Sequence, residues 1–277
     1  MKNLVDLKNK IKVGFIINPV AGMGGSVGLK GTDGKVREAL LRGSVPHAGE
    51  RAKIAMEELL PLKASLEILT YGGKMGGEIA KAMGFDCRLL GEDKEEFSAL
   101  DTLELCKKLK AENVKLLLFA GGDGTARDVY NGVGTSVIAL GIPAGVKIHS
   151  PVYAKSPKTA GALAALYLSG KEKETKEEEV LDIDEEKYRN NVLSTTLYGY
   201  LTIPYKKNYT QNRKTATPIT EKNAIRSIGM KIVSEMEEGT YYLIGAGTTT
   251  AGIMEELGLK NTLIGVDLVL NKQLLGN

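Results

Sequence analysis

The segment Lys115–Thr125, with the sequence Lys-Leu-Leu-Leu-Phe-Ala-Gly-Gly-Asp-Gly-Thr, constrains the possible fold of this chain more than any other segment. Its apolar run, Leu116–Ala120, contains no alternating polar residues, which predicts a strand buried on both faces, as in a parallel sheet covered by helices. The glycines that follow permit positive φ angles and let a ligand approach bare backbone N–H groups. A helix is predicted to begin at Thr125, and its positive end would face the same space. The segment therefore predicts a strand, an anion-binding turn and a helix.

Asp123 places a carboxylate inside this predicted turn. A negative side chain at a position suited to an anion is hard to explain by packing, and easier to explain if the acid meets a hydroxyl group or a metal ion. The alternative is that Gly-Gly-Asp-Gly is only a tight connection between a strand and a helix, and the four residues alone do not decide between the two interpretations.

The composition is that of an ordinary soluble protein, long enough at 277 residues for one large domain or two. The formal net charge of +3 is too small to indicate nucleic-acid binding. No apolar run approaches the ~20 residues that cross a bilayer, and residues 1–10 lack the apolar core of a secretion signal. Cys87 and Cys106 lie apart from each other and from both histidines, so neither a disulfide nor a zinc site is predicted. We expect a cytoplasmic protein that binds neither membranes nor nucleic acid.

Strands and helices alternate regularly along the first part of the chain, which predicts an α/β fold with a doubly wound parallel sheet. The expected strands are residues 11–18, 65–70, 87–90, 116–120 and 136–140, and the expected helices are 49–60, 77–83, 100–109 and 158–168. We therefore predict a nucleotide-binding α/β domain at residues 1–170.

The composition changes from Ser169 onward. The charged run at 171–179 is interpreted as a solvated connector or as the edge of a hairpin. Strands are expected at 179–183, 195–204 and 241–246, and helices at 219–236 and 247–257. The residues from 265 to the end are expected to form part of a hairpin with its turn at Asn271-Lys272. We therefore predict a second, β-rich, substrate-binding domain at residues 171–277.

A glycine-rich loop, residues 20–34, follows the first predicted strand. Its glycine spacing matches neither the Rossmann fingerprint nor a Walker loop. A flexible connector is the alternative interpretation, but the carboxyl end of a first strand is where open α/β sheets bind ligands. The candidate ligand contacts here are Asn18, Gly22, Gly24 and Gly25.

A third loop, residues 141–150, leaves the carboxyl end of the strand predicted at 136–140. In a parallel sheet this loop lies beside the first two. Pro143, Gly145 and Lys147 are candidate contacts to a phosphate group. A lone histidine is more often structural than catalytic, and we interpret His149 as a ligand contact rather than a base.

Three consecutive threonines begin the helix predicted after the strand at 241–246. A helix N-terminus needs one hydroxyl for capping, so three of them suggest a polar surface that tolerates anions. Thr248, Thr249 and Thr250 are therefore candidate substrate contacts.

Together these segments resemble the NAD kinase and diacylglycerol/sphingosine kinase superfamily. The Asn-Pro-x-x-Gly loop, the Gly-Gly-Asp-Gly-Thr turn, the Gly-x-x-Pro-x-Gly segment and the Thr-rich turn follow one another in the family's order. The chain departs from the family at Val146, where lipid kinases have a threonine, and it lacks the Asn-Glu pair of NAD kinases. Its Thr-rich turn also differs from their Gly-Ser-Thr-Ala-Tyr. It is closest to the divergent ATP-NAD kinase-like branch that includes the acetoin-catabolism-associated protein. Members of that branch are longer, so either the second domain is truncated at its carboxyl end or this member is short.

The resemblance implies ATP-dependent phosphoryl transfer to a nucleotide hydroxyl, most simply NAD to NADP, with Mg²⁺ bridging the phosphates. It implies that Asp123 is catalytic, accepting the proton of the ribose 2′-hydroxyl or orienting that hydroxyl, and that Thr248, Thr249 and Thr250 bind NAD. No residue is assigned as a metal ligand. The residues implied to bind the nucleotide are Asn18, Gly22, Gly24, Gly25, Gly121, Gly122, Gly124, Thr125, Pro143, Gly145, Lys147 and His149.

Two other functions stay open at this point. One is a kinase of another alcohol, such as a lipid or a small polyol. The other is a non-catalytic nucleotide sensor of the same fold, which the missing Asn-Glu pair motivates. The partners expected in each case are small molecules, nucleotides above all, and the resemblance implies a homo-oligomer.

Overall fold

The structure is a computed structural model of the 277-residue chain, and it describes residues 10–27, 29, 32, 35–94, 96–145, 148–183, 195–211, 219–262 and 265–276. The chain forms two compact units. The first contains Met1–Met23, Ser44–Asp182 and Thr196–Arg213, and the second contains Gly24–Gly43, Ile183–Thr195 and Lys214–Asn277. A functional boundary at residue 170 stays a prediction.

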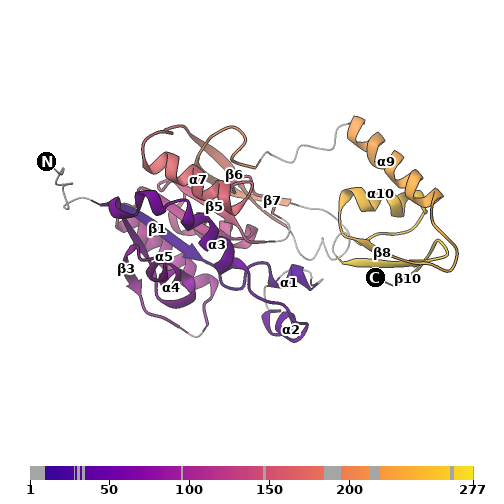
Figure 1. Cartoon of the computed structure of the whole chain (residues 1–277), viewed down its shortest axis with the longest axis horizontal. Coiled ribbons are helices and arrows are strands. Elements are labelled where there is room, and N and C mark those ends of the chain that lie inside the picture. Colours follow the sequence, from indigo (N-terminus) through magenta and orange to yellow (C-terminus); the bar gives the residue numbers. More distant parts are fainter. Residues whose placement is uncertain are drawn as a thin grey trace. The chain divides into compact units, whose positions relative to one another are not determined.

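The first unit is built on a five-stranded parallel sheet with the strand order β3-β2-β1-β4-β5 (Figure 1). Its strands are β1 (Ile11–Ile17), β2 (Leu66–Tyr71), β3 (Asp86–Gly91), β4 (Leu116–Gly121) and β5 (Ala139–Pro143). The chain moves outward from β1 to β3 and then crosses back to β4 on the other side of β1. The strand order therefore reverses between β1 and β4, and open α/β sheets bind ligands beyond the carboxyl ends of the strands at such a position.

Helices cover both faces of this sheet, which confirms the predicted doubly wound α/β fold. One face packs against α3 (Ala48–Glu57), α4 (Gly77–Ala82) and α7 (Pro157–Leu168), and the other against α5 (Ala99–Ala111) and α6 (Asp123–Val133). Along β4, Leu118 packs toward the first group of helices and Phe119 toward the second. Because the whole strand is buried, its sequence shows no polar alternation.

Two further strands of this unit, β6 (Thr175–Ile183) and β7 (Thr195–Pro204), pair with each other. They contribute Val180, Leu201 and Ile203 to the core on the α5 and α6 side of the sheet. Strand β6 begins inside the charged run at 171–179, so the second half of that run lies in a strand and not in a solvated connector.

The second unit contains a three-stranded antiparallel sheet with the order β10-β9-β8. Its elements are α1 (Met23–Ser26, from its second residue), α2 (Val36–Leu41), α9 (Ile219–Ser234), β8 (Tyr241–Gly245), α10 (Thr248–Glu256), β9 (Val266–Leu270) and β10 (Gln273–Gly276). The hairpin turn falls at Asn271 and Lys272, as predicted, and both have positive φ, as a two-residue type I′ turn requires. Helices α9 and α10 approach closely at Gly229. A Cβ there would lie 2.5 Å from the Gly252 carbonyl oxygen, so the contact requires a glycine.

Two predicted boundaries in the first unit are wrong. Strand β5 begins at Ala139, three residues later than expected, because Ser136 bonds back to the Val133 carbonyl and closes the end of α6 first. The strand then includes residues 141–143, which we had placed in the loop. The helix expected at 49–60 ends at Glu57, and the chain tightens into a 3₁₀ turn, η1 (Leu60–Ser65), that contains a proline.

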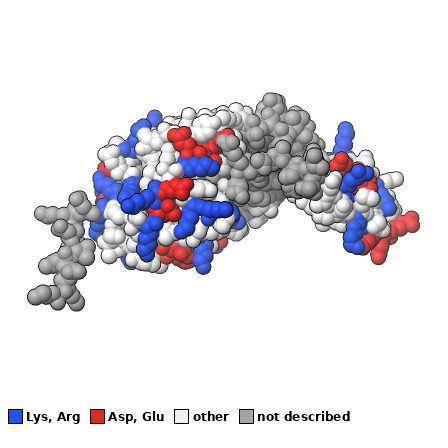
Figure 2. Space-filling model, turned by 90° about the horizontal axis from the view of Figure 1, so that it is seen from above, with Lys and Arg blue, Asp and Glu red and all other residues white. Residues whose placement is uncertain are grey.

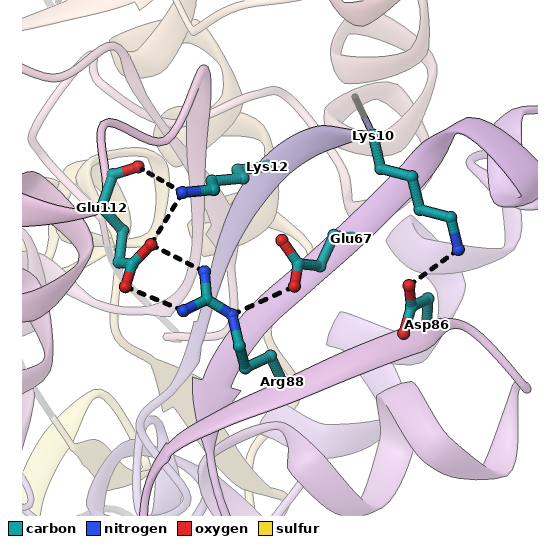
Figure 3. A network of polar contacts seen from close by, with 6 residues as sticks. All are labelled: Lys10, Lys12, Glu67, Asp86, Arg88 and Glu112. Carbon is teal, nitrogen blue, oxygen red and sulfur yellow. Dashed lines mark hydrogen bonds and ion pairs between the residues drawn. The ribbon is translucent and has the colours of Figure 1, made fainter. Parts of the chain in front are cut away.

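A network of charged side chains lies at the amino-terminal edge of the sheet, opposite the edge to which the glycine turns belong (Figure 3). Arg88 on β3 makes a bidentate pair with Glu112, at 2.7 and 2.8 Å, and bonds to Glu67 on β2 at 3.0 Å. Lys12 on β1 also reaches Glu112, at 2.8 Å. The hydrogen bonds from Arg88 and then from Lys12 lower the pKa of Glu112 to about 2. The network therefore joins three strands to the C-terminal end of α5.

Lysine and arginine side chains are interspersed with acidic ones on the face of the first unit drawn in Figure 2. Cys87 on β3 and Cys106 on α5 are free thiols, as predicted. Within the described ranges, no helix has both the length and the apolar character that a membrane-spanning segment needs.

Candidate functional site

The turn after β4 contains glycines for two different reasons. A Cβ on Gly121 would lie 2.3 Å from the Thr125 hydroxyl oxygen, so this position has no room for a side chain. In contrast, a Cβ on Gly122 would meet nothing closer than 3.9 Å, and a Cβ on Gly124 would meet nothing within 4 Å. The turn therefore leaves open space above Gly122 and Gly124, in which a ligand can approach the backbone.

Two details of the turn differ from the sequence prediction. None of these glycines has a positive φ, so no unusual backbone conformation explains them. Helix α6 begins at Asp123, two residues earlier than Thr125, with Gly122 as its N-cap residue. Asp123 therefore lies in the first turn of the helix, where the N–H groups lack partners within the helix and a negative charge is favoured.

Asn18 connects the first glycine-rich loop to this turn. Its backbone N–H extends the pairing of β1 with β4 by donating to the Ala120 carbonyl at 2.9 Å. Its side-chain amide nitrogen donates to the Thr125 hydroxyl at 3.0 Å, while its amide oxygen accepts from Val20 N–H at 3.2 Å. Asn18 and Thr125 therefore hold the ends of β1 and β4 in register.

The third loop also meets the turn. The N–H groups of Ala144 and Gly145 both donate to the Gly121 carbonyl, at 3.0 and 3.2 Å. Gly22, with φ +80°, packs so closely on this loop that a Cβ would lie 2.4 Å from the Ala144 carbonyl oxygen. The structure thus brings together the first loop as far as Gly22, the turn after β4 and the beginning of the third loop.

The carboxylate of Asp123 is held by the end of this third loop. Its Oδ2 accepts from the backbone N–H of His149 and its Oδ1 from that of Ser150, each at 2.9 Å. The Nδ1 of His149 lies 3.3 Å from the same Oδ2. Ser150 is itself fixed to β6, because its hydroxyl both donates to the Leu181 carbonyl and accepts from Leu181 N–H. The acid is therefore oriented by backbone and side-chain contacts on two sides.

The buried side chain of Tyr153 supports the turn after β4. The hydroxyl of Tyr153 donates to the Gly122 carbonyl at 2.6 Å, and its ring packs edge-on against Phe119 of β4. Complete burial, with the charges of Asp123 and Asp128, raises the pKa of this hydroxyl well above its usual range, so it stays a donor. A separate contact holds the end of β5, where Arg51 on α3 donates to the Pro143 carbonyl at 3.3 Å.

A family model for the ATP-NAD kinase N-terminal domain matches residues 13–172. The match begins in β1, continues past α7, and includes Asn18, the turn after β4 and His149. The chain belongs to the ATP-NAD kinase family. No curated protein matches the chain. Assignment of this family member to the divergent acetoin-associated branch stays a prediction.

Solved structures with some similarity to this ATP-NAD kinase family member come from Bacillus anthracis strain Sterne. A diacylglycerol kinase is 16% identical, with 64% of this chain and 48% of that chain covered and a TM-score of 0.30. A putative diacylglycerol kinase is 17% identical, with 64% and 46% covered and a TM-score of 0.28. Another putative diacylglycerol kinase is 13% identical, with 95% and 63% covered and a TM-score of 0.28. The chain therefore spans about half the length of the first two and less than two thirds of the third.

The other predicted contacts lie in the second unit or outside the described residues, and their role stays a prediction. Gly24 and Gly25 belong to α1 and to the second unit. Thr248 and Thr249 are exposed at the start of α10, also in the second unit. Thr250 bonds through its hydroxyl to the Gly247 carbonyl at 2.9 Å. Lys147 lies outside the described residues.

The sequence analysis missed three residues that hold the site together, namely Arg51, Ser150 and Tyr153. Their contacts to the turn or to the adjoining strands join segments far apart in the chain, so no local motif marks them. Ser150 ends the segment that we had singled out, and its position directly after His149 was the available signal.

A pocket of about 320 Å³ lies beyond the ends of β2 and β3, at the same edge of the sheet as the turn. It is lined by Gly73, Lys74, Glu78, Asp93 and Lys94, and so carries charges of both signs. No motif marked it because its lining comes from two separate connections in the sequence.

The implied magnesium ion fits the residues present. Among the described residues, no group of three or more His, Cys, Asp and Glu side chains is arranged to hold a metal ion. Mg²⁺ in nucleotide complexes keeps water and phosphate oxygens as ligands and needs only one or two carboxylates. The described residues fit an ion held in this way, because bound phosphate groups and water can supply most of its ligands.

Proposed function

We propose that the chain transfers the γ-phosphoryl group of ATP to a hydroxyl group of a nucleotide, with NAD as the acceptor and NADP as the product. Membership in the ATP-NAD kinase family supports this proposal. The observation that carries it is the turn after β4, in which the oriented carboxylate of Asp123 lies between two glycines with open space above them.

The phosphate groups of ATP bind to backbone N–H groups at the start of α6, next to Gly122 and Gly124. These N–H groups have no carbonyl partner within the helix, and the positive end of the helix dipole favours anions. Asn18 and Thr125 keep the first loop aligned with the turn, so the site needs little rearrangement on binding. When bound, Mg²⁺ would supply positive charge that offsets the negative charge building up on the phosphate groups during transfer.

The acceptor hydroxyl approaches the γ-phosphate in line with the bond that breaks, as phosphoryl transfer requires. Asp123 is placed to accept the proton of that hydroxyl or to orient it. Thr248, Thr249 and Thr250, at the start of α10 in the second unit, are proposed as contacts of the substrate nucleotide.

The test is the steady-state rate of NADP formation from ATP and NAD by Asp123→Asn. Asparagine cannot accept a proton and offers one acceptor oxygen to two backbone N–H groups, so kcat should fall ~10²-fold, as expected for losing a base or its orienting group. The matched control is Asp86→Asn, which removes a half-exposed carboxylate paired with Lys10 at the other edge of the sheet. The control should keep the wild-type rate.

Retention of NADP formation within about threefold of wild type by a folded Asp123→Asn protein would contradict the proposed role of Asp123, since the loss of general-base catalysis costs ~10²-fold or more. Circular dichroism and thermal unfolding establish that the variant is folded. A wild type that phosphorylates glycerol or diacylglycerol but not NAD would replace the proposed acceptor. Binding of ATP and NAD without any turnover would favour a sensor.

A further inference from the structure

His149 and Asp123 form a pair at the centre of the proposed site. Their side chains are 12% and 8% exposed, and the imidazole Nδ1 lies 3.3 Å from Oδ2 of the carboxylate. A carboxylate oxygen can only accept, so this contact is a hydrogen bond when Nδ1 carries the proton. That tautomer leaves a lone pair on the other ring nitrogen, Nε2.

The Nε2 atom has no partner within the part of the chain that the structure describes. The two contacts of His149 there are its backbone N–H and its Nδ1, both directed at Asp123. Every fully buried side-chain nitrogen or oxygen among the described residues has a hydrogen-bond partner. Nε2, which makes no such bond, is therefore not fully buried and is open to solvent.

The carboxylate of Asp123 and the imidazole of His149 differ in how many of their acceptor atoms already accept a hydrogen bond. Both oxygens of Asp123 already accept a backbone N–H at 2.9 Å, whereas Nε2 of His149 accepts no hydrogen bond from any residue in the described ranges. A base activated by an adjacent group that fixes its tautomer is the usual arrangement for proton removal from a hydroxyl. The free acceptor in this pair is therefore Nε2 of His149, whereas the carboxylate of Asp123 is placed to orient the imidazole.

We propose that Nε2 of His149 takes the proton of the acceptor hydroxyl and that Asp123 orients the imidazole; this inference rests on the proposed function. The hydroxyl oxygen attacks the γ-phosphorus of ATP, a new O–P bond forms, and the bond from that phosphorus to the β,γ-bridging oxygen breaks. ADP leaves with the electron pair of the broken bond. The proton passes to Nε2, and the carboxylate of Asp123 neutralises the imidazolium until the proton is lost to water.

The surroundings hold His149 in place for this task. The next residue, Ser150, is completely buried and tied to β6 through two hydrogen bonds of its hydroxyl, at 2.8 and 3.0 Å. Tyr153 fixes the turn through the bond from its hydroxyl to the Gly122 carbonyl. A base held by its neighbours needs no reorganisation before it reacts, which is the property that catalytic groups require.

The test compares His149→Ala and His149→Asn with wild type and with His47→Ala. Asparagine keeps a donor near the Nδ1 position and hence the contact to Asp123, but it has no basic nitrogen. We expect kcat for NADP formation to fall ~10²-fold in both His149 variants, while the KM for ATP stays within about threefold of wild type. Free imidazole should restore the rate of His149→Ala by about tenfold or more. His47, the other histidine, is exposed and pairs with Glu50, so His47→Ala should behave as wild type.

A wild-type kcat in His149→Asn would show that the contact to Asp123 is all that matters, and would overturn the inference. So would a folded His149→Ala protein that imidazole does not rescue. Nitrogen-15 spectra of the wild type give a readout that does not depend on turnover, and His47→Ala assigns the two imidazole signals. A protonated Nδ1 with a bare Nε2 is expected, and a proton on Nε2 in the neutral ring would overturn the inference. A wild type that phosphorylates no hydroxyl overturns the proposed function itself, and this outcome differs from an active wild type with active His149 variants.

Discussion

At the scale of single residues, the turn after β4 separates glycines needed by the fold from glycines needed by a ligand. Gly121 is required because Thr125 occupies the space that a side chain would need. Gly122 and Gly124 have open space instead. The sequence predicted the turn and its acid but could not distinguish these roles, because the distinction depends on which neighbour faces each glycine.

This distinction makes opposite predictions for two alanine substitutions. Gly124→Ala should leave thermal stability unchanged or slightly higher, because alanine favours a helix by up to ~1 kcal/mol over glycine. Its methyl group should nevertheless occupy the space proposed for the phosphates and raise the KM for ATP about tenfold, equivalent to ~1.4 kcal/mol of binding free energy.

Gly121→Ala, in contrast, should lower the free energy of unfolding by roughly 1–3 kcal/mol, because a methyl group there overlaps the Thr125 side chain. Thermal unfolding and ATP kinetics on both variants check the pair. An unchanged KM in Gly124→Ala would show that the open space above this glycine does not receive the nucleotide.

At the scale of elements, the two ends of the sheet serve different purposes. The carboxyl end carries the glycine turns, whereas the amino end carries the network in which Arg88, Lys12 and Glu112 connect strands to α5. The order of the five parallel strands and of the main helices between them could be predicted from apolar periodicity, whereas α1 and α2 were not predicted. The network could not, because its members come from four separate elements or their ends and each looks like an ordinary surface charge in the sequence.

The network predicts a pH dependence of stability. The pKa of Glu112 is lowered from 4.5 to about 2 in the folded protein, so its contribution to stability is fully present above pH ~4.5. As the pH falls from 4.5 toward 2, this contribution is progressively lost because the unfolded chain binds the proton more readily. Glu112→Gln should therefore reduce the pH dependence of stability in this window.

Urea unfolding of wild type and Glu112→Gln at pH 7, 4 and 3 measures this effect. The difference in unfolding free energy between the two proteins should shrink as the pH falls. Glu38→Gln, which alters an exposed pair with Arg42 on α2, is the control. A difference that stays constant with pH would mean that the pairs of Glu112 do not contribute to folding.

At the scale of the whole molecule, the sequence predicted the doubly wound sheet and the meeting of three loops at its carboxyl edge. Both follow from elementary rules, since consecutive strands joined by helices lie parallel and their following loops share one edge. The contact of His149 with Asp123 did not follow, because it depends on how the loop folds back after β5. The contribution of β6 and β7 to the first unit was also unforeseen, because the change in composition from Ser169 and the charged run at 171–179 suggested a second domain.

The most direct test of the central claim is phosphorus-31 NMR of wild-type protein with ATP, NAD and Mg²⁺. The account predicts that ADP and a 2′-phosphorylated NAD appear in equal amounts, and that both accumulate ~10²-fold more slowly with Asp123→Asn. ADP and inorganic phosphate without a phosphorylated nucleotide, or ATP that is not consumed, would contradict it.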